Sequence, residues 1–299
     1  MRVLTAIGLC LLICSACTSD QQTSIRYSGI LAASEFLPGN NRIPFGMVSK
    51  DGVFLEDADL MVRIAKLNGD EWQITQKAIP RWEVIEGVTP HTHPDGELHL
   101  HLDFHGIYIL DNVFFDTPGI WSLQFVALDG TPTEEAVFRV KEVGVAPEIG
   151  EQAIPINNLT IHNADTFEDI SSRAGGNDGM HDYSVAEALR IKEPFVVFFA
   201  SPEFCVTAMC GPVTDTLARA KETLKNDVIF IHIEPWNLEI ARNEGRLVKS
   251  KAMELWQLPS EPWTFIVDKH GVIQSRFEGL VTVTEVLNAV VPLLEGYPN

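Results

Sequence analysis

The sequence predicts two domains, an all-β sandwich followed by an α/β unit. Two are expected because 299 residues with 45% hydrophobic content can bury two cores. Short alternating segments separated by turn residues occupy residues 36–145. A continuous apolar run, Phe195–Ala200, is typical of a fully buried strand and begins a strand-and-helix pattern within residues 181–299. Residues 146–180, which include prolines and the run SSRAGGNDG, are predicted to be a linker.

The start of the chain has the pattern of a secreted lipoprotein. Arg2 precedes an apolar stretch that is too short to span a membrane, and small residues precede Cys17. We therefore expect residues 1–17 to be a lipoprotein signal peptide and Cys17 to carry the lipid; simple secretion with cleavage nearby is the alternative. Polar residues 18–35 are predicted to be a flexible tether. The expected location is a bacterial cell envelope, lipid-anchored on the periplasmic or outer-surface side.

The charge of the chain argues against nucleic acid as a partner. Lys and Arg number 22 and Asp and Glu number 41, which gives a formal net charge of −19. A chain of this charge repels phosphate backbones and anionic membrane surfaces, and attracts cations and basic partners.

Within residues 36–145, alternating segments recur at spacings typical of a β-sandwich. They are Leu60–Lys66, Glu97–Phe104, Gly106–Leu110, Trp121–Ala127 and Ala136–Val143. The run GIYILDNVFFDTPGIWSLQF resembles the later strands of immunoglobulin-like modules in envelope proteins. This resemblance implies an immunoglobulin-like sandwich.

A histidine-rich stretch, HTHPDGELHLHLDFH, is a candidate metal site in this region. On a strand, His99, His101 and His105 share one face. A three-residue hairpin loop would add His91, opposite His99, and His93 to that face, whereas a two-residue loop would turn both toward the apolar side. Clustered imidazoles suit Cu(II), Zn or Ni. The alternative is a solvated polar strand face.

Two thiols follow the strand Phe195–Ala200. Once the signal peptide is removed and Cys17 is capped, only Cys205 and Cys210 remain, which indicates a site and not a disulfide framework. On an intact helix their Cα atoms would be separated by about 7.5 Å of rise, beyond the usual disulfide limit. Gly211-Pro212 predicts a helix that begins after Cys210, so that both thiols lie in a loop that can close. The alternative is a pair of ordinary buried cysteines.

The predicted helix start also suggests which thiol reacts. A thiol beside the amino end of a helix has a lowered pKa, so Cys210 is expected to be the more acidic one. Before the apolar strand, Ser184 followed by Glu187 forms a capping-box pattern that predicts a short helix within His181–Arg190. His232 and His270 are expected to be surface or loop residues.

The order of elements resembles the thioredoxin-like fold over residues 180–299. After the dithiol loop come a helix (Val213–Leu224), a strand (Val228–Ile233), a helix (Leu238–Trp256) and the run SEPWTFIVDKHGVIQSRFEG. The resemblance implies that Pro262 is the cis-proline of this family, placed against the sulfurs to hold a substrate strand. It also implies a β-hairpin that turns at Asp268–Gly271.

The spacing of the two cysteines resembles more than one branch of this superfamily. CVTAMC is longer than the thioredoxin CxxC, and CGPV resembles CGPC with Val213 in place of the second cysteine, so the family's nucleophile matches either Cys205 or Cys210. CxxxxC is similar to the spacing in Q-type peroxiredoxins. The copper-insertion proteins of cytochrome oxidase use CxxxC and a distant histidine on the same fold.

Thiol–disulfide exchange is the function that these features predict. One thiolate would attack a disulfide of an envelope protein, and the other would resolve the mixed disulfide, with no cofactor required. The first alternative is a copper carrier that uses Cys205, Cys210 and a histidine. If the protein binds a metal, copper or zinc is expected. The second alternative is a redox-inert interaction module with one structural disulfide.

Overall fold

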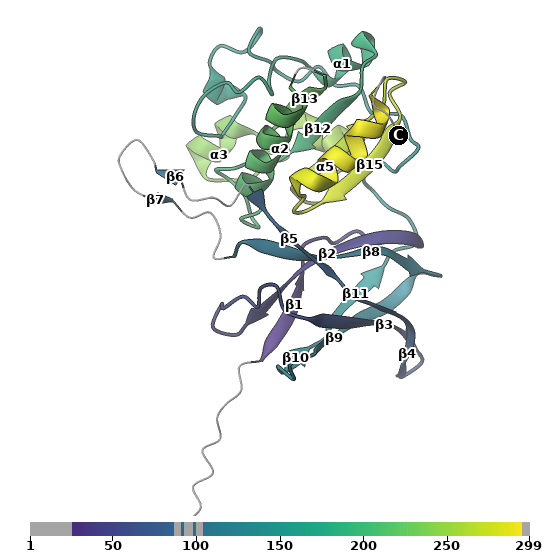
Figure 1. Ribbon diagram of the computed structural model, residues 1–299. Coiled ribbons are helices and arrows are strands. Elements are labelled where there is room, and N and C mark those ends of the chain that lie inside the picture. Colours follow the sequence, from purple (N-terminus) through teal and green to yellow (C-terminus); the bar gives the residue numbers. More distant parts are fainter. Residues whose placement is uncertain (1–25, 87–90, 93–97, 100–103, 226, 295–299) are drawn as a thin grey trace, which may run out of the picture.

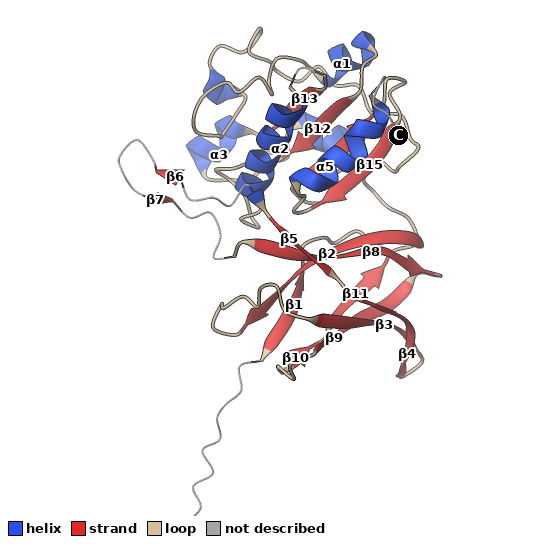
Figure 2. Cartoon of the chain, in the orientation of Figure 1, coloured by secondary structure: helices blue, strands red, loops and turns tan. Residues whose placement is uncertain are grey.

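The computed structural model describes residues 26–86, 91–92, 98–99, 104–225 and 227–294 (Figure 1). Most of its regular structure is β-sheet, with strands β1–β15 and the shorter helices α1–α5 (Figure 2). The predicted signal peptide and Cys17 lie outside the described residues. Among the described residues, no helix combines the length and apolar character needed to cross a membrane.

The N-terminal part consists of two sheets that face each other. One has the strand order β10-β1-β2-β8-β5, and the other β11-β9-β3-β4. The strands are β1 (Tyr27–Leu31), β2 (Gly39–Ser49), β3 (Leu60–Asn68), β4 (Glu71–Ala78), β5 (Arg81–Val84), β8 (Gly106–Phe115), β9 (Gly119–Ala127), β10 (Thr133–Glu134) and β11 (Ala136–Val140). A small hairpin, β6 (His91–Thr92) and β7 (Leu98–His99), follows β5.

Alternation of side chains explains how the two sheets pack. In β3, Leu60, Val62 and Ile64 are buried, and in β9 Trp121 and Leu123 are buried beside them. All five belong to one hydrophobic cluster that also receives residues of β2 and β8 from the facing sheet. Because side chains alternate between the two faces of a strand, this period of two buries one face of each sheet.

The predicted tether overlaps the first sheet. Strand β1 begins at Tyr27, within the range 18–35, and pairs antiparallel with β2. Tyr27 is buried in the cluster between the sheets. The polar composition of that range led to the wrong prediction for these residues, because backbone pairing with β2 depends on a distant segment.

The C-terminal part is organised around a mixed sheet of order β13-β12-β14-β15. Strands β12 (Phe195–Phe199) and β13 (Ile229–Ile233) are parallel, whereas β14 (Trp263–Val267) and β15 (Ile273–Glu278) form an antiparallel hairpin that turns at the predicted Asp268–Gly271. Helices α2 (Cys210–Leu224) and α5 (Val283–Val290) pack on one face (Figure 1). Helices α1 (Val185–Ile191) and α4 (Lys251–Leu255) pack on the other.

This arrangement accounts for the apolar run in β12. Val196 and Phe198 enter the cluster beneath α2 and α5, and Phe195, Val197 and Phe199 enter the cluster on the opposite face. A strand covered on both faces needs no polar side, which is why alternation disappears here.

Local sequence signals predict the start of α1 but not the break between α3 and α4. Ser184 and Glu187 form the predicted capping box of α1. The single helix expected over Leu238–Trp256 is instead two, α3 (Leu238–Glu244) and α4. Gly245 adopts a left-handed conformation with φ of 64° that ends α3.

The segment predicted as a linker is part of the C-terminal core. Ala146, Ala153 and Ile156 are buried in the cluster that contains α1 and α4. Gln152 pairs with Val272 as an extended bridge, and a short 3-10 helix spans Phe167–Asp169. Proline and glycine correctly indicated irregular backbone here, but not its burial.

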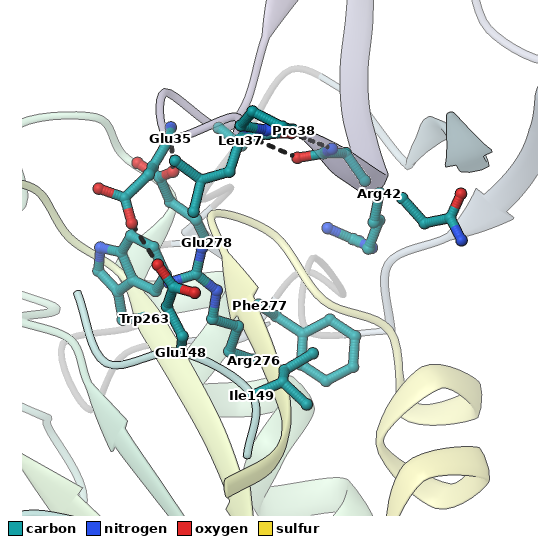
Figure 3. Close-up of a pocket in the computed structure, with 13 residues that line it drawn as sticks. Glu35, Leu37, Pro38, Arg42, Glu148, Ile149, Trp263, Arg276, Phe277 and Glu278 are labelled. Atoms are coloured by element: carbon teal, nitrogen blue, oxygen red, sulfur yellow. Dashed lines mark hydrogen bonds and ion pairs between the residues drawn. The ribbon is translucent and has the colours of Figure 1, made fainter. Parts of the chain in front are cut away.

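Charged and apolar contacts join the two parts. Glu285 of α5 accepts hydrogen bonds from Arg42 of β2 and Arg81 of β5, and Ile85 and Ile107 share a hydrophobic cluster with α2. Beside these contacts lies a cavity of ≈ 290 Å³ (Figure 3). Its lining includes Glu35, Arg42, Trp263, Arg276, Phe277 and Glu278. The two thiols do not line it.

Candidate thiol site

Two free cysteines and a buried carboxyl converge where strand β12 ends. Cys205 lies in the loop after β12, Cys210 is the first residue of α2, and Glu261 precedes β14 through a cis peptide bond to Pro262. One ligand atom of each of the three residues lies within 4.8 Å of the others. We refer to these three residues as the dithiol group. Its donor atoms can hold a metal ion.

Hydrogen bonds select Cys205 as the acidic thiol. Its Sγ accepts the backbone N–H of Cys210 at 3.2 Å and lies 3.5 Å from Thr207 Oγ1. The Cys210 thiol also bonds to it, and this contact is the largest of those that lower the pKa of Cys205 to about 6. Cys205 is only partly buried, whereas Cys210 is fully buried.

Cys210 behaves in the opposite way. It is fully buried, and burial raises the pKa of its thiol far above the ordinary value, with further rises from the Cys205 contact and from the charges of Cys205 and Glu261. The expectation that Cys210 is the more acidic thiol is therefore wrong. The helix begins at Cys210 and not after it, so the N–H of Cys210 points at Cys205 and stabilises that thiolate, while the Cys210 side chain lies in the core.

Glu261 is a member of the site that sequence reasoning missed. It is 4% exposed, and its Oε1 accepts the backbone N–H of Val206 at 3.2 Å. Among the described residues, its Oε2 has no hydrogen-bond partner. Burial raises the pKa of Glu261 to about 7, and the nearby Trp236 side chain lowers it in part. The indole N–H of Trp236 makes no hydrogen bond to a described residue. A carboxylate directly before Pro262 was the only signal in the sequence.

A second buried carboxyl anchors the start of the thiol loop. Glu234 follows β13, is 7% exposed, and accepts the backbone N–H of Ser172 at 2.6 Å. The Ser172 hydroxyl lies 3.4 Å from that of Ser201 and accepts the backbone N–H of Glu203. Burial raises the pKa of Glu234 to about 7. Ser172, in the segment that the sequence predicts to be a linker, thus holds the loop that carries Cys205.

The structure describes part of the histidine-rich stretch. His91 lies opposite His99 in the β6–β7 pair, which is the register expected for a three-residue loop. His105 is exposed and bonds to Glu56. His93 and His101 lie outside the described residues.

His232 is buried and not a surface residue. Its Nε2 lies 2.8 Å from the carbonyl oxygen of Ala200, its ring stacks on Phe198, and the ring of His181 packs against it with centroids 4.9 Å apart. Burial holds the pKa of His232 well below the ordinary value and lowers that of His181 to about 4. Both imidazoles are therefore neutral packing elements beneath the thiol loop.

No protein-family model matches the chain, and no curated protein matches it.

Proposed function

We propose that the protein exchanges thiols and disulfides with envelope proteins, with Cys205 as the nucleophile and Cys210 as the resolving thiol. The observation that carries this proposal is the 3.2 Å hydrogen bond from the Cys210 backbone to Cys205 Sγ, between a half-buried and a fully buried free thiol. A helix N–H directed at a sulfur favours its thiolate, the reactive form.

The chemistry needs no group beyond the two thiols and the partner. The Cys205 thiolate attacks a sulfur of the partner disulfide, forms a mixed disulfide and releases the first partner thiolate. Cys210 then loses its proton and attacks Cys205 Sγ, which releases the second partner thiolate and leaves a Cys205–Cys210 disulfide. The partner is reduced and the protein is oxidised by two electrons. Glu261, within 4.8 Å, is placed to accept the proton of Cys210.

The same proposal includes the finer fold assignments. The order β13-β12-β14-β15, with a parallel pair, an antiparallel hairpin and helices on both faces, supports a thioredoxin-like unit over residues 181–299. The cis peptide bond at Pro262, on the chain segment that carries Glu261, also supports it. The two facing sheets of residues 27–140 support an immunoglobulin-like sandwich.

A redox titration with a trapping variant tests the exchange. The reduced protein is equilibrated against glutathione buffers, and the Cys205–Cys210 disulfide should appear reversibly within the accessible range. Cys210→Ser should accumulate a mixed disulfide at Cys205, and the matched Cys205→Ser variant should accumulate none, because the buried thiol is protonated. A bond that stays oxidised at every potential would instead support a structural disulfide.

We also propose that Cys17 anchors the protein to an envelope membrane. Cells that express the full chain should incorporate labelled palmitate into it, and Cys17→Ala should abolish the label. Incorporation that persists in the variant would exclude this residue as the lipid site.

Metal carriage is a second candidate, favoured by the convergence of the dithiol group. Copper and zinc are the ions to consider, because thiolates bind both. The sequence predicts a histidine as the third ligand of a copper carrier, whereas the third residue of the dithiol group is Glu261. A carrier would pass its metal from the loaded protein to an apo acceptor, which metal analysis of the two separated proteins would measure.

A further inference from the structure

Three acidic ligand atoms meet in a site that is largely withdrawn from water. Cys210 is fully buried and Glu261 is 4% exposed, so a cation placed between them would be shielded from solvent. The ligand atoms of Cys205, Cys210 and Glu261 lie within 4.8 Å of one another. Groups arranged in this way either keep their protons or share a cation, since several like charges cannot be buried together.

We propose that the reduced dithiol group holds one Zn²⁺ through Cys205 Sγ, Cys210 Sγ and a carboxylate oxygen of Glu261, and that the metal-bound form is closed to exchange. The regulatory half of this inference rests on the proposed function, whereas the binding half does not.

The geometry requires only a small contraction. Zinc–sulfur bonds of about 2.3 Å and zinc–oxygen bonds of about 2.1 Å place tetrahedral ligands roughly 3.5 Å apart. The three ligand atoms already lie within 4.8 Å of one another. Closing the group around an ion therefore moves side chains by about an ångström and leaves the backbone of α2 in place.

An unsatisfied oxygen points independently to a ligand. Glu261 uses Oε1 to accept the Val206 N–H, while Oε2, buried with it, has no hydrogen-bond partner among the described residues. A buried carboxylate oxygen without a partner costs free energy that a metal ion would recover.

The donor set selects zinc over the other common ions. Two soft thiolates exclude Mg²⁺ and Ca²⁺, which take oxygen ligands, and a carboxylate is a poor third ligand for Cu(I). Zinc accepts sulfur and oxygen together. Three protein ligands also leave a fourth coordination position open. Such a site releases its metal more readily than a closed site with four protein ligands.

Binding would compete directly with the redox chemistry. Zinc engages both sulfurs, so neither remains free to attack a partner disulfide. The oxidised protein has no thiolate to offer, so disulfide formation expels the metal. Zinc would therefore act as a reversible cap on the reduced state.

Zinc titration of the reduced full-length mature protein tests the site, with a chromophoric chelator as competitor. We expect one equivalent to bind, and none to bind to the oxidised protein or to Cys205→Ser. Glu261→Gln should weaken binding by at least about tenfold, since even loss of a residue that only orients a metal ligand costs on the order of 10–100-fold in affinity. The matched control is Glu203→Gln, a carboxyl in the same loop whose side chain is 50% exposed, which should leave affinity unchanged.

Alkylation of Cys205 shows whether the Glu261→Gln variant is folded, and it separates the zinc-binding proposal from the exchange proposal. In metal-free Glu261→Gln, Cys205 should still be alkylated before the buried Cys210, which shows that the loop is intact. One equivalent of Zn²⁺ should block alkylation of the unaltered protein, and a chelator should restore it. Unchanged affinity in Glu261→Gln, or binding that survives in Cys205→Ser, overturns the zinc site. Zinc binding without disulfide exchange overturns the proposed function and leaves the site.

Discussion

Arg42 donates two hydrogen bonds to Glu285, from Nε at 2.6 Å and from Nη2 at 2.8 Å, and so ties strand β2 to helix α5. Arg81 adds a third at 2.8 Å. Glu285 also closes the capping box of α5 through Thr282. One carboxylate therefore both starts the helix and joins the two parts of the chain.

Removing this carboxylate should destabilise the junction strongly. Glu285→Ala removes the carboxylate that pairs with Arg42, at a site where the Glu285 side chain is 8% exposed, and leaves Arg81 with Glu83 and Asp111. We expect the free energy of unfolding to fall by about 3–5 kcal/mol, the usual cost of breaking a buried pair. Urea denaturation measures it. Glu244→Ala is the control, because Glu244 pairs with Arg246 at the surface and should leave the midpoint nearly unchanged. Equal effects of the two substitutions would contradict this account.

Cys205 should be the thiol that reacts first with an alkylating reagent. Because the hydrogen bond from Cys210 lowers its pKa to about 6, the alkylation rate should rise with pH around a midpoint near 6 and level off by neutral pH. Cys210 should remain unmodified in the folded protein. Mass spectrometry of peptides after timed alkylation checks the site, and Cys205→Ser should show no fast phase. Early modification of Cys210 would restore the assignment made from the sequence.

Glu234 should make stability depend on pH. Burial raises its pKa to about 7 in the folded state, against an ordinary value of 4.5, so the folded protein binds the proton more tightly than the unfolded chain. The resulting contribution, about 3 kcal/mol, is fully present below about pH 4.5 and is lost as pH rises through about 7. Glu234→Gln mimics the protonated form and removes this dependence. Unfolding curves of both proteins at pH 5 and pH 8 test it, and a constant difference between them would refute it.

Gly279 should tolerate no side chain. Its φ is +76°, and a Cβ there would lie 1.8 Å from the carbonyl oxygen of Ala32, on the segment that follows β1. Gly279→Ala should therefore cost more than the roughly 1–2 kcal/mol of left-handed strain alone. Gly130→Ala isolates that strain, because Gly130 has φ of +84° and open space around it. Thermal or urea unfolding should rank the two variants in this order. If Gly130→Ala proves as damaging, the contact with Ala32 is not the cause.

The sequence by itself determined the features that depend on near neighbours along the chain. The apolar run Phe195–Ala200 predicts a buried strand because no face of it is polar, and the structure confirms a buried strand over Phe195–Phe199. Ser184 and Glu187, three residues apart, form the capping box that their spacing predicts. Strands β3, β8, β9 and β11 overlap segments that alternation predicts. Each of these signals acts within a few residues, so a linear reading can find it.

Only the tertiary structure decided which groups form the site and how they ionise. Glu261 joins Cys205 and Cys210 from more than fifty residues away, through pairing of β14 with β12. The acidities of the two thiols are the reverse of the prediction, because burial of Cys210 outweighs its place at the start of α2. His232 is likewise buried, because the rings of Phe198 and His181 pack against it. Burial depends on what packs against a residue from elsewhere in the chain, and electrostatic free energies depend on burial more than on sequence position.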